Sequence, residues 1–268
     1  MSRRSPRPGI RIVHEDERIT AIDKSPALTS VSERWDPAAP TAIDLLWEEW
    51  KRADPDAPRP HVIHRLDKDT SGLLLFARDR EAQVSLREQF RARSVEKTYF
   101  ALTNGVPEAA EGSIEVSIEP DPARPGRVRT VRRGGKECRT EYRTEQVLGP
   151  HAWVRLHPRT GRTHQLRISL RELGTPIVGD PWYGDGAPLL LSSVKRDYRP
   201  GRGEPERPLL GRLGLHALQL TFAHPAGGAH DDITSDRKPS IHEARGCSAG
   251  AATAARRASV RIGSGGIV

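Results

Sequence analysis

The feature that most constrains this chain is the apolar run LLLFA at 73–77, which follows directly after the polar stretch HVIHRLDKDTSG at 61–72. The run is too short for an independent helix, and it predicts a strand over 72–77 that is buried on both faces. Two histidines, an arginine and two aspartates therefore stand at one end of a core element. Such a group is typical of a turn, a metal site or the edge of an enzyme active site.

The remaining pattern predicts a chain of mixed α and β structure. Residues 10–23 contain two β-prone runs around a polar turn and favour a hairpin. Residues 41–53 favour a helix, and Asp79 is a suitable N-cap for a second one. Further strands are expected at 97–105, 151–158 and 215–225, a basic hairpin or loop at 124–143, and a short amphipathic helix carrying Leu166, Leu170 and Leu173.

Composition divides the chain into three parts. Residues 1–9 are expected to be a disordered basic arm, and residues 10–225 a single domain. From 226 to 268 the sequence becomes rich in Ala, Gly, Ser and Arg and loses its periodicity, which predicts a low-complexity, disordered tail. We see no internal repeat.

The charge balance points to a polyanionic partner. The formal net charge is +8 and the isoelectric point is about 9.9, which favours nucleic acid first and an anionic membrane surface second. No stretch approaches the 18 or so apolar residues of a membrane span, and no apolar signal segment follows the basic N-terminus. The two cysteines are far apart, which argues against a disulfide framework or a paired-cysteine zinc site. The expected location is the cytoplasm.

The polar stretch at 61–72 is ambiguous when it is considered alone. Asp67 before Thr-Ser-Gly is most often a turn or cap residue. His61 and His64 have the spacing of metal ligands, but no further cluster of His, Cys or Glu stands nearby to complete a zinc sphere.

A second stretch, LHPRTGRTHQLR at 156–167, places basic residues around the start of the short helix. Backbone N–H groups at a helix start, with Arg159 and Arg162 beside them, form a suitable phosphate site. A solvated basic helix face is an equally good interpretation of this stretch alone.

Together these stretches resemble the RluA family of RNA pseudouridine synthases. The resemblance rests on HRLDKDTSGLLLFA, EKTYFAL and TGRTHQLRISLRELGTPIVGDPWYG, and it extends in order from about residue 10 to residue 225. It includes an opening region around Asp23 and Lys24 and the closing LHALQLTFAHP. It implies an α+β pseudouridine synthase fold with a mostly antiparallel central sheet, flanking helices and a basic cleft.

The resemblance also implies roles for individual residues. The essential aspartate of the family falls at Asp67, which either attacks C1′ or removes a sugar proton. Tyr99 matches the tyrosine that packs on the uracil, and Arg167 the arginine that keeps the aspartate ionised. The contacts with RNA and its bases are expected from Arg65, His64, Thr70, Arg162 and His164. Isomerisation of uridine oxidises nothing and releases no group, so no cofactor or metal is expected.

The expected function is therefore isomerisation of uridine to pseudouridine in a structured ribosomal or transfer RNA. No obligatory protein partner and no membrane association are expected. The alternative is a non-catalytic RNA-binding or ribosome-assembly protein that retains the fold. Two departures from the family are apparent: the residues before Ile10 are too few for an S4-type RNA-binding domain, and the usual ending after the last strand is missing.

Overall fold

The structure is a computed structural model that describes residues 9–32, 39–195, 198, 205–227 and 230–235. The described chain divides into two compact units, in contrast to the single domain expected over 10–225. The first unit contains the described residues up to 96 together with 217–235, and the second contains 97–216. The expected basic arm, apart from Gly9, and the expected tail beyond 235 lie outside the described residues.

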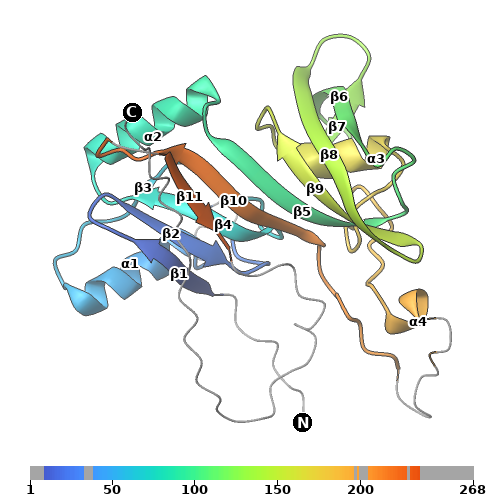
Figure 1. Cartoon of the computed structure of the whole chain (residues 1–268). Helices are drawn as coiled ribbons and strands as arrows, with labels where there is room; N and C mark the ends of the chain where they lie inside the picture. Colours follow the sequence, from blue (N-terminus) through green and yellow to red (C-terminus); the bar gives the residue numbers. More distant parts are fainter. Residues whose placement is uncertain (1–8, 33–38, 196–197, 199–204, 228–229, 236–268) are drawn as a thin grey trace, which may run out of the picture. The chain divides into compact units, whose positions relative to one another are not determined.

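The first unit is a sheet with two helices (Figure 1). Strands β1, β2, β4 and β10 follow one another across the sheet, with β3 pairing with β4 and β11 with β10. All the pairings β1–β2, β2–β4, β3–β4 and β10–β11 are antiparallel. The elements are β1 (Ile10–Glu15), β2 (Ile19–Lys24), α1 (Ala42–Ala53), β3 (His61–Val62), β4 (Ser71–Ala77), α2 (Arg80–Ala92), β10 (Leu215–Ala223) and β11 (His230–Thr234).

The expected hairpin, helices and buried strand of this unit are confirmed. Every residue of β4 is buried, and Leu73 and Leu75 share a core cluster with Leu86 of α2. The side chain of Asp79 accepts a hydrogen bond from the N–H of Ala82 at 2.8 Å and caps α2. The strand is therefore buried as its unbroken apolar sequence requires.

The prediction of a disordered tail from residue 226 is wrong at its beginning. Strand β11 pairs with β10 along its whole length, from Gln219 opposite Thr234 to Ala223 opposite His230. Its sequence, HDDIT, is largely polar, and Ile233 alone joins the core. A short polar edge strand of this kind has almost no hydrophobic signal, so its pairing is determined by the neighbouring strand and not by its own pattern.

The second unit is a five-stranded antiparallel sheet in the order β5, β9, β8, β6, β7. A basic hairpin or a loop was expected at 124–143, and of these the hairpin is wrong, because β7 and β8 lie on opposite sides of β6 instead of beside each other. The elements are β5 (Glu96–Asn104), β6 (Glu111–Pro120), β7 (Val128–Val131), β8 (Lys136–Leu148), β9 (His151–Pro158), α3 (Gln165–Glu172) and α4 (Leu191–Val194).

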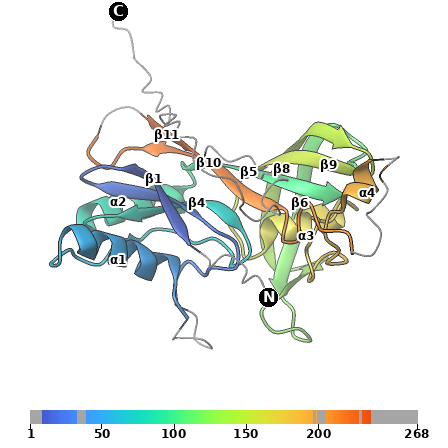
Figure 2. The ribbon, with the colours of Figure 1, turned by 90° about the horizontal axis from the view of Figure 1, so that it is seen from below.

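Helix α3 lies against one face of this second sheet (Figure 2). Val154 and Leu156 of β9 form a core cluster with Leu166 and Leu170 of α3. Arg155 lies between Val154 and Leu156 in β9, so its side chain points to the face of the sheet opposite α3. In the described residues, no helix has both the length and the apolar character needed to cross a membrane.

Candidate active site

The loop that carries Asp67 lies between β3 and β4 in the first unit. Leu66 is buried, and its backbone exchanges two hydrogen bonds with the hydroxyl of Ser30, at 3.0 and 2.9 Å. The next four residues form a turn in which the N–H of Thr70 donates to the carbonyl of Asp67 at 3.1 Å. Asp67 is half-buried at this turn, Arg65 is exposed, and Thr70 is only 2% exposed.

The side chain of Lys24 holds the backbone of this loop through hydrogen bonds. It is fully buried, and its Nζ donates to the carbonyls of Ser25, Leu28 and Lys68 at 3.0, 2.7 and 3.0 Å. A buried ammonium is stable only when its N–H groups donate hydrogen bonds. A hydrogen bond from a charged donor is stronger than one between two neutral groups. Because Lys68 is the residue after Asp67, Lys24 holds the backbone at the candidate catalytic position.

Two further residues of the loop have structural contacts. The Nε2 atom of His64 accepts a hydrogen bond from the N–H of Leu75 at 3.1 Å, and the ring stacks on Phe90 at 4.7 Å between centroids. Gly72 has φ of +110°, and a Cβ there would stand 2.1 Å from the carbonyl oxygen of Ala217 in β10. Only glycine fits this close approach.

In the second unit, Arg167 of α3 forms a buried ion pair with Asp180. Its Nε and Nη2 atoms donate to the two carboxylate oxygens at 2.8 and 2.7 Å, and the side chains are 4% and 0% exposed. The N–H groups of Trp182 and Tyr183 donate to the same carboxylate at 2.9 and 3.1 Å. Burial alone raises the pKa of Asp180, but these bonds and the charge of Arg167 outweigh it, so that the pKa lies below its usual value.

The sequence does not indicate the role of Asp180. The stretch GDPWYG is part of the resemblance, but nothing in it distinguishes the aspartate. Its proline and two glycines have the pattern of a turn, in which an aspartate is unremarkable. A guanidinium has five N–H donors, and two of those of Arg167 bond to Asp180.

The loop before α3 is organised by Gln165, which is buried. Its amide contacts the hydroxyls of Thr160 and Thr140, the carbonyl of Arg139 and the N–H of Arg162 at 2.8 to 3.1 Å. The N–H of Gln165 in turn donates to the carbonyl of Arg162. Two of the backbone N–H groups at this helix start, those of Arg162 and Gln165, are therefore bonded within the chain. The phosphate site expected here stays a prediction.

The other expected site residues of the second unit also lie near α3. His164 has φ of 52° at the N-cap, and its Nδ1 lies 2.9 Å from the hydroxyl of Tyr183. Arg162 is half-buried. Tyr99 pairs with Leu156 across β5 and β9 and packs beside the cluster that holds α3. Tyr99 therefore lies on the same face of this sheet as α3.

The expected site residues thus form two groups. The first group belongs to the first unit and consists of His64, Arg65, Asp67 and Thr70. The second group belongs to the second unit and consists of Tyr99, Arg162, His164 and Arg167. The pairing of Asp67 with Arg167 stays a prediction.

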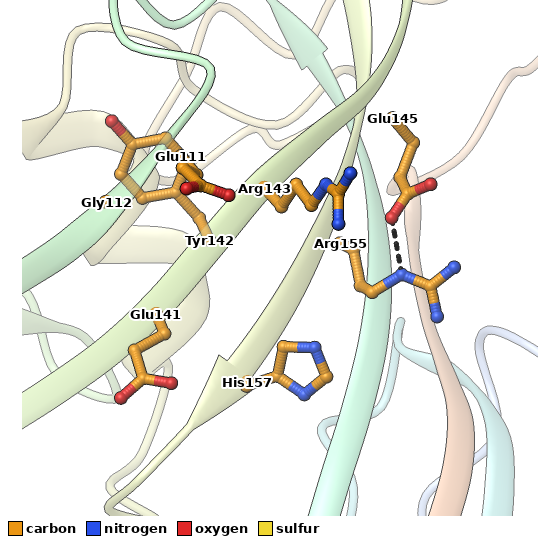
Figure 3. A pocket seen from close by; sticks show the side chains of 8 residues that line it. All are labelled: Glu111, Gly112, Glu141, Tyr142, Arg143, Glu145, Arg155 and His157. Carbon is orange, nitrogen blue, oxygen red and sulfur yellow. Dashed lines mark hydrogen bonds and ion pairs between the residues drawn. The ribbon is translucent and has the colours of Figure 1, made fainter.

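A hollow of about 690 Å³ lies on the other face of the second sheet (Figure 3). Among the side chains that line it, Arg155 donates to Glu145 at 2.6 Å, and His157 stands opposite Glu141 across β9 and β8. Because His157 alternates with Leu156, this face is the one opposite Tyr99 and α3. Its mixed charges do not favour an RNA backbone. Among the described residues, no group of three or more His, Cys, Asp and Glu side chains is placed to hold a metal ion.

Comparisons with known proteins identify the family. Residues 18–172 match the family model for RNA pseudouridylate synthases. The chain is 33% identical over 252 residues to the ribosomal large subunit pseudouridine synthase D of Xanthomonas campestris, which covers 92% of this chain and 73% of that protein. It is 35% identical over 224 residues to the dual-specificity RNA pseudouridine synthase RluA of Vibrio vulnificus, with 81% and 79% covered.

Solved structures agree with this assignment. The human RNA pseudouridylate synthase domain containing 4 matches with a TM-score of 0.64 and 27% identity, covering 85% of this chain and 88% of that one. The human domain containing 1 matches with a TM-score of 0.62 and 25% identity over 88% and 86%. The expected α+β fold is confirmed by these neighbours. Since the family model spans more than half of the chain, this protein belongs to the RNA pseudouridylate synthase family.

Proposed function

We propose that Asp67 is the carboxylate with which this pseudouridine synthase isomerises uridine in RNA. The observation that carries the proposal is the construction of its loop. The half-buried Asp67 lies at a turn whose backbone is held by the fully buried Lys24 and by Ser30. A turn without a function does not need a buried ammonium beneath it, because burying that charge is costly. Fixing a reactive group in this way is what catalysis requires.

The chemistry needs one carboxylate and one way to move a proton. The C1′–N1 bond breaks, the uracil turns, and a C1′–C5 bond forms. C5 loses a proton, and the released N1 gains one. Positive charge develops on the sugar when the glycosidic bond breaks, and a carboxylate next to C1′ stabilises or traps it. We assign this role to Asp67, and to Tyr99 the packing on the uracil and the removal of the C5 proton.

Arg167 is proposed to keep Asp67 ionised in the sheltered site. Its guanidinium is held by the two bonds to Asp180, which orient the plane of the fork. Asp180 is thus a positioning residue for Arg167.

The substrate is proposed to be a structured RNA, either ribosomal or transfer RNA. The target base must leave its stack before the reaction, and the exposed Arg65 next to Asp67 is proposed to support the flipped nucleotide. His64, Thr70, Arg162 and His164 are proposed to contact the RNA around it. The net charge of +8 supports a partner with a phosphate backbone.

The function is tested by mapping pseudouridine in total RNA from cells with and without the gene. The proposal predicts that at least one pseudouridine is lost and that the unaltered gene restores it, which also names the RNA. A gene with Asp67→Asn should not restore it. Restoration by that variant, or an unchanged map, would favour the alternative of a non-catalytic RNA-binding or ribosome-assembly protein.

A further inference from the structure

Trp182 is an exposed aromatic residue beside the Arg167–Asp180 ion pair. The residue is 37% exposed, which makes it one of the few exposed large hydrophobic residues of the described chain. The residue follows Asp180 by two positions, and its N–H donates to that carboxylate at 2.9 Å. The backbone beneath this exposed ring is therefore fixed by a buried charge.

Cationic and polar groups surround the indole. The guanidinium carbon of Arg127 lies 5.1 Å from the ring centroid, and that of Arg167 lies 5.2 Å from it. His164 meets the ring edge-on at 5.1 Å between centroids. Arg127 also donates to the carbonyl of Trp182 at 3.4 Å, which ties the loop between β6 and β7 to this position. The ring is thus held in place by these contacts, while the residue as a whole stays 37% exposed.

We propose that Trp182 is a stacking platform for a nucleobase of the bound RNA, other than the uridine that is isomerised. The inference rests on the proposed function, because it needs an RNA at this site and because Tyr99 is assigned to the target uracil. Proteins that hold single-stranded RNA combine aromatic rings for the bases with cations for the neighbouring phosphates. Trp182 supplies such a ring, and Arg127 supplies a cation next to it. Any base has a π-face, so this contact adds affinity without reading sequence.

The competing explanation is that Trp182 only shields the Arg167–Asp180 pair from water. The two explanations differ in what they affect. If Trp182 is a stacking platform, its substitution weakens binding only of RNA that carries bases. If Trp182 only shields the ion pair, its substitution lowers stability and turnover, and its effect on RNA binding is the same with and without bases.

The test compares two probes of equal length, an oligouridylate and an abasic oligoribonucleotide that keeps the phosphates but has no bases. We expect Trp182→Ala to weaken binding of the oligouridylate roughly 5- to 150-fold, from the known contribution of one base–aromatic stack. Trp182→Phe keeps a ring and should lose less. Binding of the abasic probe should change little in either variant.

A matched control is Trp47→Phe. Trp47 is a half-buried tryptophan of α1 that also lies beneath two cations, Lys51 at 4.1 Å and Arg59 at 5.0 Å. Its substitution should leave both affinities unchanged. Binding of the oligouridylate should quench tryptophan fluorescence in the unaltered chain and in Trp47→Phe, but much less in Trp182→Phe.

The proposal is overturned if Trp182→Phe and Trp182→Ala weaken both probes equally, or weaken neither. It is also overturned if they lower kcat on an RNA transcript while the affinity for the oligouridylate is kept. If the unaltered chain bound neither probe, the inference would be overturned, whereas the proposed function, which concerns a structured RNA, is decided separately by the pseudouridine map. A loss restricted to the probe with bases, at an unchanged melting temperature for Trp182→Phe, supports the platform.

Discussion

Replacing Asp180 by asparagine should destabilise the second unit strongly, because it removes one charge from a fully buried ion pair. Asp180 accepts hydrogen bonds from Arg167 and from the N–H groups of Trp182 and Tyr183. An asparagine of the same shape directs an NH₂ group at these donors and leaves the guanidinium uncompensated. Breaking a buried pair in this way typically costs about 3–5 kcal/mol. For a chain of this size that corresponds to a fall in Tm of about 6 to 20 °C.

The pH dependence of this effect is determined by the lowered pKa of Asp180. A carboxyl whose pKa is lower in the folded state stabilises the fold at any pH above its unfolded pKa of about 3.9. That contribution is lost as the pH falls through the folded pKa. The difference in Tm between the unaltered chain and Asp180→Asn should therefore be full at neutral pH and shrink as the pH is lowered below about 4.

The control is Asp185→Asn in the same segment. Asp185 is exposed and accepts from Asn104 at 3.1 Å and from the N–H of Ala187 at 2.9 Å. Its loss should cost about 0.5 kcal/mol, as is usual at a surface site. Differential scanning fluorimetry at several pH values provides both comparisons. Equal Tm values for Asp180→Asn and Asp185→Asn, or a difference that persists unchanged in acid, would refute the assignment of a stabilising buried pair.

Two further predictions concern the Asp67 loop. Lys24→Met keeps the stem but removes the donor from the carbonyls of Ser25, Leu28 and Lys68. We therefore expect a loss of about 3 kcal/mol in urea unfolding and a fall in kcat larger than the change in KM; unchanged stability and turnover would contradict the role of Lys24. Gly72→Ala places a methyl group 2.1 Å from a backbone oxygen at positive φ, whereas Gly134→Ala at φ of +72° meets nothing within 4 Å. Gly72→Ala should therefore lower Tm much more than Gly134→Ala, for which only a backbone strain of about 1 kcal/mol is expected. Equal Tm shifts for the two variants would contradict a rigid close contact between Gly72 and β10.

The sequence was sufficient for those elements that have strong local signals. The apolar run at 73–77 predicts the buried strand, and Asp79 is identifiable as a helix cap. Each of these signals lies within a few residues of the element that it predicts. The family resemblance located Asp67, Tyr99 and Arg167, and their catalytic roles stay predictions.

The features that the sequence did not predict depend on distant partners. Lys24 is separated by 44 positions from Lys68, whose carbonyl it binds, and nothing in a lone lysine indicates that its ammonium is buried. Asp180 stands in a turn-like stretch, and its role becomes visible only when α3 is packed against it. The pairing of β7 with β6 instead of β8 is likewise a matter of long-range register, which a basic stretch around two glycines does not encode.

The most direct test of the central claim measures the release of tritium from RNA that carries 5-tritiated uridine. Release reports the loss of the C5 proton, and it is measured with the unaltered chain, with Asp67→Asn and with the control Asp69→Asn, on RNA from cells that lack the gene. Asp69 is half-buried in the same turn and carries the same charge. The account predicts release with the unaltered chain and with Asp69→Asn, and none with Asp67→Asn, although that variant still binds the RNA. Substantial release by Asp67→Asn would show that Asp67 is not the catalytic carboxylate.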